Sequence, residues 1–246
     1  MTVAATFPDL AGRTVVVTGA ADGIGYATTS ALLQQGAKVI GIDIRQADHG
    51  GSYRHIDCDL RNPSAIAAAF SDITHLDHVV NVAGIDPLHS LEEGDASVWD
   101  NVVNLDLRAY YLVIRAAVPL LRQGNGRSIV NVSSINYRLG VPKRSIYSAA
   151  KSGILGLTRG LARELGADGI RINTVSPGWI FTPRQEAEYF TGAMADKHLE
   201  YLYHQQSIRL HLTPSNVAAP IVYLLSDISC GTTGSNVVVD AGWLLE

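Results

Sequence analysis

Residues 13–25 read RTVVVTGAADGIG, and this stretch decides the fold. Its first half is a β-branched run with the length and composition of a strand that is buried on both faces. The run leads directly into Gly19, Gly23 and Gly25, and a helical pattern continues to Gln35. Glycines here allow a tight turn and a close approach of the backbone to a pyrophosphate, and a helix N-terminus directs its amide groups at phosphates. Strand, glycine turn and helix together predict a dinucleotide-binding site.

The rest of the chain alternates between apolar runs of strand length and longer helical patterns. This alternation predicts a single Rossmann-like α/β domain over residues 1–246, a doubly wound parallel sheet with helices on both faces. Residues 181–213 interrupt it with a helical pattern that no strand follows, which indicates a substrate-binding lid insertion. The expected strands are 13–18, 37–42, 78–82, 128–132, 170–175 and 236–239, and the expected helices are 23–35, 63–70, 98–121, 145–166 and 216–225.

Composition excludes several classes of function. The 246 residues are 47% hydrophobic with a net charge of −4, and no block of Lys and Arg suggests a nucleic-acid partner. No apolar stretch approaches the roughly 20 residues of a membrane helix, and the first residues lack a signal-peptide pattern. Two cysteines make no disulfide framework, and no His/Cys/Asp cluster has metal-site spacing. We expect a cytoplasmic, metal-free enzyme that acts on a small molecule.

Asp43 selects the cofactor. It ends the second expected strand, at the distance from the glycine turn where ribose recognition is expected. A carboxylate accepts hydrogen bonds from both ribose hydroxyls of NAD and repels the additional phosphate of NADP. Two alternatives to NAD recognition by Asp43 stay open. Arg45 could bind the additional phosphate of NADP, and Asp43 could simply cap the strand end. The sequence favours NAD.

A second motif carries the chemistry. Tyr147 and Lys151 are four residues apart, which places them on one face of a helix. A phenol titrates near 10 when unperturbed, and a close ammonium and a positive nicotinamide ring both favour the phenolate. Ser134, at a strand end, can hydrogen-bond a substrate oxygen as it changes between alkoxide and carbonyl. An ordinary amphipathic helix would explain a lone Tyr/Lys pair. The pair together with the glycine turn and the strand-end serine predicts hydride transfer between nicotinamide and a secondary alcohol or ketone.

Together these motifs resemble the classical short-chain dehydrogenase/reductase (SDR) family over nearly the full chain. The matching segments are TGxxxGxG at Thr18–Gly25, NNAG at Asn81–Gly84 with Val82 in place of the second Asn, YxxxK at Tyr147–Lys151, and PG…T at Pro177, Gly178 and Thr182.

The resemblance implies a role for each catalytic residue. Tyr147 is the proton donor and acceptor, and Lys151 lowers its pKa and binds the nicotinamide ribose. Ser134, thirteen residues before Tyr147, orients the substrate oxygen, and Asn104 supports a water that passes protons to Lys151. The family usually forms tetramers, so we expect a homotetramer. The cofactor contacts that it implies are Gly19, Asp22, Gly23, Ile24, Gly25, Asp43, Asp59, Leu60, Asn81, Ala83, Gly84, Tyr147, Lys151, Pro177, Gly178, Ile180 and Thr182.

The substrate is suggested only by charge. The segments that form the family's pocket are unusually polar here, and an Arg can hold a carboxylate with two hydrogen bonds. We therefore expect a small, hydroxylated anion such as a sugar acid or a keto-deoxy sugar acid, although each arginine taken singly is more often a solvated loop residue. The expected substrate contacts are Ser134, Asn136, Arg144, Tyr147 and Arg184.

Two other functions share these motifs. A 3-oxoacyl-thioester reductase normally uses NADPH, which Asp43 disfavours, and a non-catalytic NAD-binding sensor would not need an intact catalytic set.

Two lid residues, His198 and Tyr201, are expected to pack rather than to bind ligand. The apolar C-terminus around Trp243 is expected either to reach a neighbouring subunit or to pack on its own.

Overall fold

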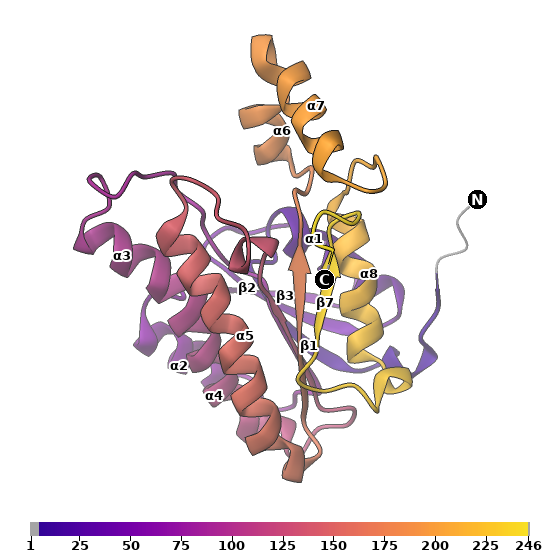
Figure 1. Ribbon diagram of the computed structural model, residues 1–246. Helices are drawn as coiled ribbons and strands as arrows, with labels where there is room; N and C mark the ends of the chain where they lie inside the picture. Colours follow the sequence, from indigo (N-terminus) through magenta and orange to yellow (C-terminus); the bar gives the residue numbers. More distant parts are fainter. Residues whose placement is uncertain (1–4, 246) are drawn as a thin grey trace.

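Seven parallel strands form one sheet in the computed structural model, which describes residues 5–245 (Figure 1). The order is β3-β2-β1-β4-β5-β6-β7, so the direction of winding reverses between β1 and β4. Ligands of such sheets bind in the crevice outside the carboxyl ends of the strands at this reversal. The predicted fold class is confirmed. The strands are β1 (Thr14–Thr18), β2 (Lys38–Asp43), β3 (Tyr53–Asp57), β4 (His78–Asn81), β5 (Ser128–Val132), β6 (Arg171–Pro177) and β7 (Asn236–Val239).

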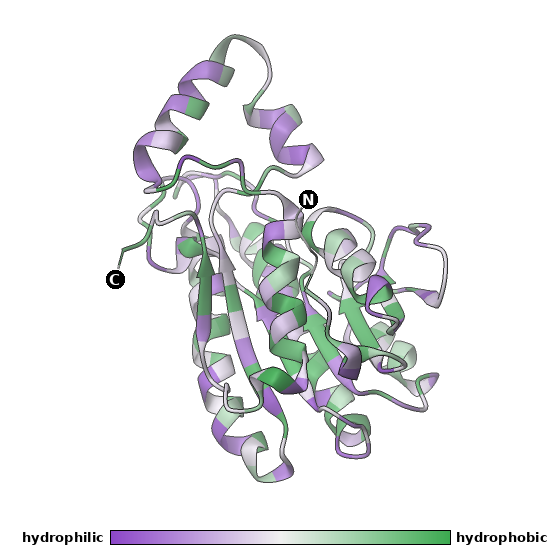
Figure 2. Ribbon diagram, turned by 90° about the vertical axis from the view of Figure 1, so that its right-hand side faces the viewer, coloured by the Kyte–Doolittle hydropathy of each residue, from purple (hydrophilic) through white to green (hydrophobic). Residues whose placement is uncertain are grey.

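Helices cover both faces of the sheet (Figure 1). On one face α1 (Gly23–Gln34) packs against α8 (Pro214–Leu225), and on the other lie α2 (Pro63–Ser71), α4 (Ala109–Leu121) and α5 (Ser145–Leu165). Successive side chains of a strand point to opposite faces. Val16 therefore packs into the core under α2 and α4, whereas Val15 and Val17 pack into the core under α1 and α8. The β-branched run is buried on both sides, as its composition predicts, and Figure 2 shows the hydrophobic residues gathered in the strands.

Two local features differ from the predictions. Edge strand β3 was not expected, because its residues are half-exposed and include charged side chains that give no apolar run. The single helix expected over 98–121 is divided into α3 (Ala96–Val103), a π-helical turn (Asn104–Arg108) and α4. The Ala109 amide donates to the Asn104 carbonyl across this wider turn. Single π-turns inside helices are frequent at functional sites.

The insertion between β6 and α8 forms two helices, α6 (Pro183–Tyr189) and α7 (Ala195–Gln205), that stand beyond the carboxyl ends of the strands (Figure 1). The Thr182 side chain accepts a hydrogen bond from the Gln185 amide and begins α6. Figure 2 shows mixed hydropathy along both helices. The segment therefore overhangs the edge where the ligand crevice is expected. Short 3-10 turns lie at Pro8–Leu10, Ile135–Tyr137, Gly166–Asp168, Gly192–Met194 and Asp227–Ser229.

Within residues 5–245, no helix combines the length and apolar character that crossing a membrane requires. Over the same range no three His, Cys, Asp or Glu side chains are grouped so that they could hold a metal ion. Cys58 is buried and Cys230 is exposed, and neither forms a disulfide.

Candidate active site

The glycine turn forms a cradle with no room for side chains. Gly19 has a φ of +69°, a conformation that glycine adopts at little cost. A Cβ placed on Gly25 would lie 1.9 Å from the Gly19 carbonyl oxygen. Asp22 caps α1 by accepting a hydrogen bond of 2.7 Å from the Gly23 amide. The N-terminus of α1 thus meets the end of β1 with its backbone uncovered, which fits the pyrophosphate of a dinucleotide.

Segments that are distant in sequence meet around this cradle. A Cβ on Gly19 would come within 2.9 Å of the Ala83 backbone, and a Cβ on Gly23 would lie 3.2 Å from the Thr182 methyl group. The NAG-like and PG…T segments therefore border the glycine turn, as the family resemblance implies. Asn81 is buried and donates to the Asn131 side chain at 2.9 Å, which joins the ends of β4 and β5.

Asp59 and Leu60 follow β3 at the same edge of the sheet. The Leu60 side chain packs in the core, and Asp59 forms an ion pair of 2.9 Å with Arg61. The Arg61 hydrogen bond is the largest influence on the Asp59 pKa, which is lowered. Contact of these two residues with adenine stays a prediction.

Asp43 has two structural contacts at the end of β2. Its carboxylate accepts hydrogen bonds from the Ala21 amide at 3.0 Å and from the Arg45 amide at 2.9 Å. The Arg45 guanidinium turns to Asp22, 3.4 Å away. Asp43 therefore does cap the turn, and it also stands beside the cradle where a ribose is expected. The two roles are compatible because a carboxylate has about four lone-pair sites.

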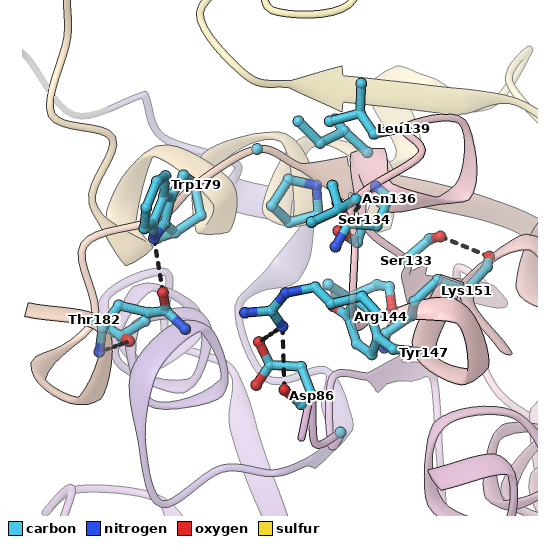
Figure 3. Close-up of a pocket in the computed structure, with 18 of the residues that line it drawn as sticks. Asp86, Ser133, Ser134, Asn136, Leu139, Arg144, Tyr147, Lys151, Trp179 and Thr182 are labelled. Atoms are coloured by element: carbon cyan, nitrogen blue, oxygen red, sulfur yellow. Dashed lines mark hydrogen bonds and ion pairs between the residues drawn. The ribbon is translucent and has the colours of Figure 1, made fainter. Parts of the chain in front are cut away.

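Three of the four predicted catalytic residues come together at the start of α5 and the end of β5 (Figure 3). Ser134 and Tyr147 line the same cavity, and Ser134 is one of the groups that lower the pKa of the phenol. The Lys151 ammonium is buried, lies 5.5 Å from the centre of the Tyr147 ring and donates to the Val132 carbonyl at 3.3 Å. The neighbouring Ser133 hydroxyl donates instead to the Lys151 carbonyl, at 2.8 Å. Ser134 is thus the serine that faces the phenol.

Burial dominates the acidity of the phenol. Burial is the largest influence on the pKa of Tyr147 and raises it, and the Asp106 and Asp86 carboxylates raise it further. The Lys151 ammonium and Ser134 both lower this pKa. The resulting pKa lies above its ordinary value. Lys151 acts in the direction expected from the sequence, but it does not outweigh burial.

The fourth predicted catalytic residue, Asn104, opens the π-helical turn, and its role stays a prediction. Asp106, two residues further, was not predicted. It is fully buried, lines the pocket and lies 3.3 Å from the Lys151 ammonium. The sequence did not indicate a buried site for Asp106, because an aspartate in a predicted helix is usually a solvated surface residue. Its burial depends on the π-turn, which the sequence pattern does not predict.

A cavity of about 460 Å³ extends from Tyr147 to the overhanging helices. All five predicted substrate residues line it, which are Ser134, Asn136, Arg144, Tyr147 and Arg184. Arg144 donates both to the Asp86 carbonyl, at 3.1 Å, and to the Asp86 carboxylate, as Figure 3 shows. Arg184 pairs with the second oxygen of the same carboxylate. Both candidate carboxylate ligands are therefore already paired with one residue that the sequence analysis did not single out.

Aromatic side chains also line the cavity. Trp179 donates its indole N–H to Gln185 at 2.7 Å, which fixes the ring beside the cavity. Tyr201 and Trp243 also line the cavity and meet edge to face with centroids 6.0 Å apart. Trp243 therefore contacts a residue of its own chain, and a contact of the C-terminus with a neighbouring subunit stays a prediction. Tyr201 and His198 border the cavity as well as packing.

Comparison with known proteins identifies the family. Residues 19–244 match the family model described as Enoyl-(Acyl carrier protein) reductase. The chain is 38% identical to a D-xylose 1-dehydrogenase of Caulobacter vibrioides, covering 97% of this chain and 98% of the relative. It is 35% identical to a probable galactose dehydrogenase of Rhizobium meliloti, over 96% of each chain.

A solved structure agrees with these sequence matches. The ligand-free aldohexose dehydrogenase of Thermoplasma acidophilum superimposes with a TM-score of 0.89 at 30% identity, over 96% of each chain. The same family is indicated by the family model, the relatives, the sheet order and the arrangement of Ser134, Tyr147 and Lys151. The chain belongs to the short-chain dehydrogenase/reductase family, as an oxidoreductase that acts on CH–OH groups with a nicotinamide cofactor.

Proposed function

We propose that this protein is an NAD-dependent dehydrogenase that oxidises the C1 hydroxyl of a neutral aldose to the lactone. The observation that carries the proposal is the Tyr147 side chain, which lies with Ser134 and the Lys151 ammonium in a small cavity that borders the glycine cradle. The names of relatives that act on D-xylose, galactose and aldohexose support a sugar as substrate.

The chain's own residues move the proton. A nicotinamide cofactor held at the glycine cradle would supply the acceptor for the hydride of C1. Tyr147, as the phenolate, takes the proton from the C1 hydroxyl, so the sugar loses one hydride and one proton and gains a C=O bond. Ser134 donates a hydrogen bond to the same oxygen as its charge changes, and the Lys151 ammonium stabilises the phenolate. Asn104 is proposed to support a water beside Lys151.

Asp86 favours a neutral sugar over a sugar acid. Its carboxylate pairs with both Arg144 and Arg184, so a substrate carboxylate would have to compete with it for them. Sugar hydroxyls can donate to Asp86 and accept from the arginines without breaking these pairs. Trp179 and Trp243 offer apolar faces for the C–H side of a sugar ring. Glu188 also pairs with Arg184, at 3.8 Å, so the charges of the cluster cancel. The sugar acid expected from the sequence is kept as the second candidate.

A substrate screen separates the candidates. Purified protein is assayed with NAD and with NADP against D-xylose, D-galactose and D-glucose, the corresponding aldonic and uronic acids, long-chain alcohols, and a 3-oxoacyl thioester with NADH or NADPH. We expect the highest kcat/KM with a neutral aldose and NAD. A higher value with sugar acids restores the anionic substrate, a higher value with the thioester supports the reductase, and cofactor binding without any turnover supports a sensor.

The Asp86→Asn variant tests the sugar contact. We expect KM for the aldose to rise about 10- to 100-fold, the cost of losing hydrogen bonds to a charged group, with a smaller change in kcat. Steady-state kinetics at saturating NAD measure this. Asp100→Asn, an exposed aspartate on α3, serves as the control and should leave KM unchanged. An unchanged KM in Asp86→Asn would place the sugar elsewhere.

The Asp43→Ser variant tests the choice of cofactor. Removing the carboxylate takes away the ribose hydrogen bonds and the repulsion of the additional phosphate, so the ratio of kcat/KM for NAD to that for NADP should fall by roughly 100-fold or more. Asp72→Ser, an exposed aspartate after α2, should leave the ratio as it is. An equal loss with both cofactors would mean that Asp43 only holds the turn through Ala21 and Arg45.

Assembly and location belong to the same proposal. We propose a cytoplasmic homotetramer. Trp99 and Tyr111 are about half exposed, at 48% and 47%, and give α3 and α4 an apolar surface of the kind found at subunit contacts. Two cysteines without a disulfide suit a reducing compartment. Light scattering after size exclusion measures the mass, and a monomer in solution would contradict the tetramer.

A further inference from the structure

Asp106 is a buried carboxylate that the proposed chemistry does not use. Its side chain has no exposed surface, and one oxygen accepts a hydrogen bond of 2.9 Å from the Ile85 amide. The other oxygen lies 3.3 Å from the Lys151 ammonium, and no other hydrogen-bond partner within residues 5–245 reaches it. Gly84 leaves room for this pair, because a Cβ there would come within 2.8 Å of the same oxygen and 3.2 Å of the ammonium.

The π-helical turn Asn104–Arg108 places Asp106 at this point. In it the Ala109 amide reaches back to the Asn104 carbonyl, one residue further than in an α-helix, which shifts the face that each side chain occupies. A charge that is buried without a partner costs several kcal/mol. Burial raises the pKa of Asp106, and the Lys151 ammonium is the neighbour that opposes this most. The group that favours the carboxylate form is therefore a catalytic residue.

We propose that Asp106 is a positioning residue, the counter-ion that holds the Lys151 ammonium beside Tyr147 and sets the pH range in which Tyr147 accepts a proton. The inference rests on the proposed function of Tyr147. Without Asp106, the positive charge of Lys151 would act on the phenol with less opposition. Among residues 5–245, the Val132 carbonyl would remain as the hydrogen-bond acceptor of the ammonium. The Tyr147 phenol would then release its proton at lower pH, because a carboxylate that raises its pKa has been removed.

Several charged and titratable groups face this pair. From α5 come Tyr147 and Lys151 themselves, from the π-turn Asp106, and from the segment after β4 Asp86. The Tyr110 ring of α4 lies 5.3 Å from the ammonium, and its hydroxyl donates to the Val132 carbonyl at 3.1 Å. Asp86 is already paired with two arginines, so Asp106 is the carboxylate whose removal changes the field at Lys151 most directly.

The first experiment is a pH profile of kcat/KM for the aldose at saturating NAD. In wild type the profile rises with pH as the phenol ionises. In Asp106→Asn, which keeps a hydrogen-bond acceptor for the Ile85 amide, we expect the rising limb to move down by about one to two pH units. Asp77→Asn is the matched control, since Asp77 is a buried aspartate that accepts hydrogen bonds from the Thr14 and Asn125 amides at the amino ends of the strands, away from the site. That control should leave the limb where it is.

A limb that does not move in Asp106→Asn, or that moves up, would overturn the proposal, even if activity falls. Asp106→Ser provides a second neutral variant if the asparagine does not fold, and the same shift is expected from it.

The second experiment does not depend on turnover, so it separates failure of this inference from failure of the proposed function. Urea denaturation is followed for Lys151→Met, Asp106→Asn and the double variant. Lys151→Met should lower the midpoint by leaving the carboxylate unpaired. Asp106→Asn should raise the midpoint in the Lys151→Met background and lower it, or leave it unchanged, in the wild-type background. The same shift in both backgrounds would show that the two residues do not act as a pair and would overturn the proposal.

Discussion

Replacing Tyr147 with phenylalanine is expected to lower kcat for sugar oxidation by roughly 10³- to 10⁴-fold, because the variant has no group to take the proton from the substrate hydroxyl. The ring and its packing are retained, so folding and NAD binding should be close to wild type. Turnover and NAD titration by protein fluorescence measure the two properties separately. Tyr223→Phe, a partly exposed tyrosine on α8, is the matched control and should change neither. Substantial turnover in Tyr147→Phe would assign the proton transfer to another group.

The acidity of Tyr147 also sets the direction of the pH dependence. Burial raises its pKa, so at neutral pH the phenol of the free protein holds its proton. Sugar oxidation needs the phenolate, and its rate should therefore rise with pH through the range in which the phenol ionises. Reduction of the product uses the protonated phenol and should change with the opposite sign. Initial rates in both directions across pH test this pair of slopes.

Gly25→Ala is the second change with a large expected effect. Its Cβ would lie 1.9 Å from the Gly19 carbonyl oxygen, in the backbone of the cradle itself, so either β1 or α1 must move. We expect the free energy of unfolding to fall by about 2–3 kcal/mol, the range for overpacking in a tight site, and NAD affinity to fall with it. Urea denaturation and NAD titration provide the two readouts.

Gly166→Ala is the control for this change. Gly166 is exposed after α5, and no atom outside its own chain neighbours lies within 4 Å of a Cβ built there. Alanine should be tolerated at this position or slightly stabilising. If Gly25→Ala were as stable as Gly166→Ala and still bound NAD tightly, the close contact between α1 and the glycine turn would not be required.

Local patterns in the sequence were enough to predict the fold and the centre of the site. The run RTVVVT is buried on both faces because it lies in an inner strand, and its composition shows this without any tertiary information. Gly19 and Gly25 likewise show in the sequence that a backbone turn must stay uncovered. The Tyr/Lys spacing of four residues places both side chains on one face of α5 before any neighbour is known.

Features that depend on contacts between distant segments were not predictable. Asp86, Arg144 and Arg184 meet in space although up to 98 positions separate them in the chain, and the sequence shows two free arginines rather than a charge cluster. Strand β3 forms because β2 offers a free edge, not because its own residues alternate in hydropathy. Asp106 depends on a π-turn, which has no simple sequence pattern.

The most direct test uses D-xylose and D-galactose that carry deuterium at C1. Each sugar is incubated with NAD and the wild-type protein, and the reduced cofactor is analysed by mass spectrometry. We expect one deuterium in each NADH molecule formed, together with a primary isotope effect on the rate. Turnover that leaves the deuterium on the sugar, or releases it to water, would contradict hydride removal from C1.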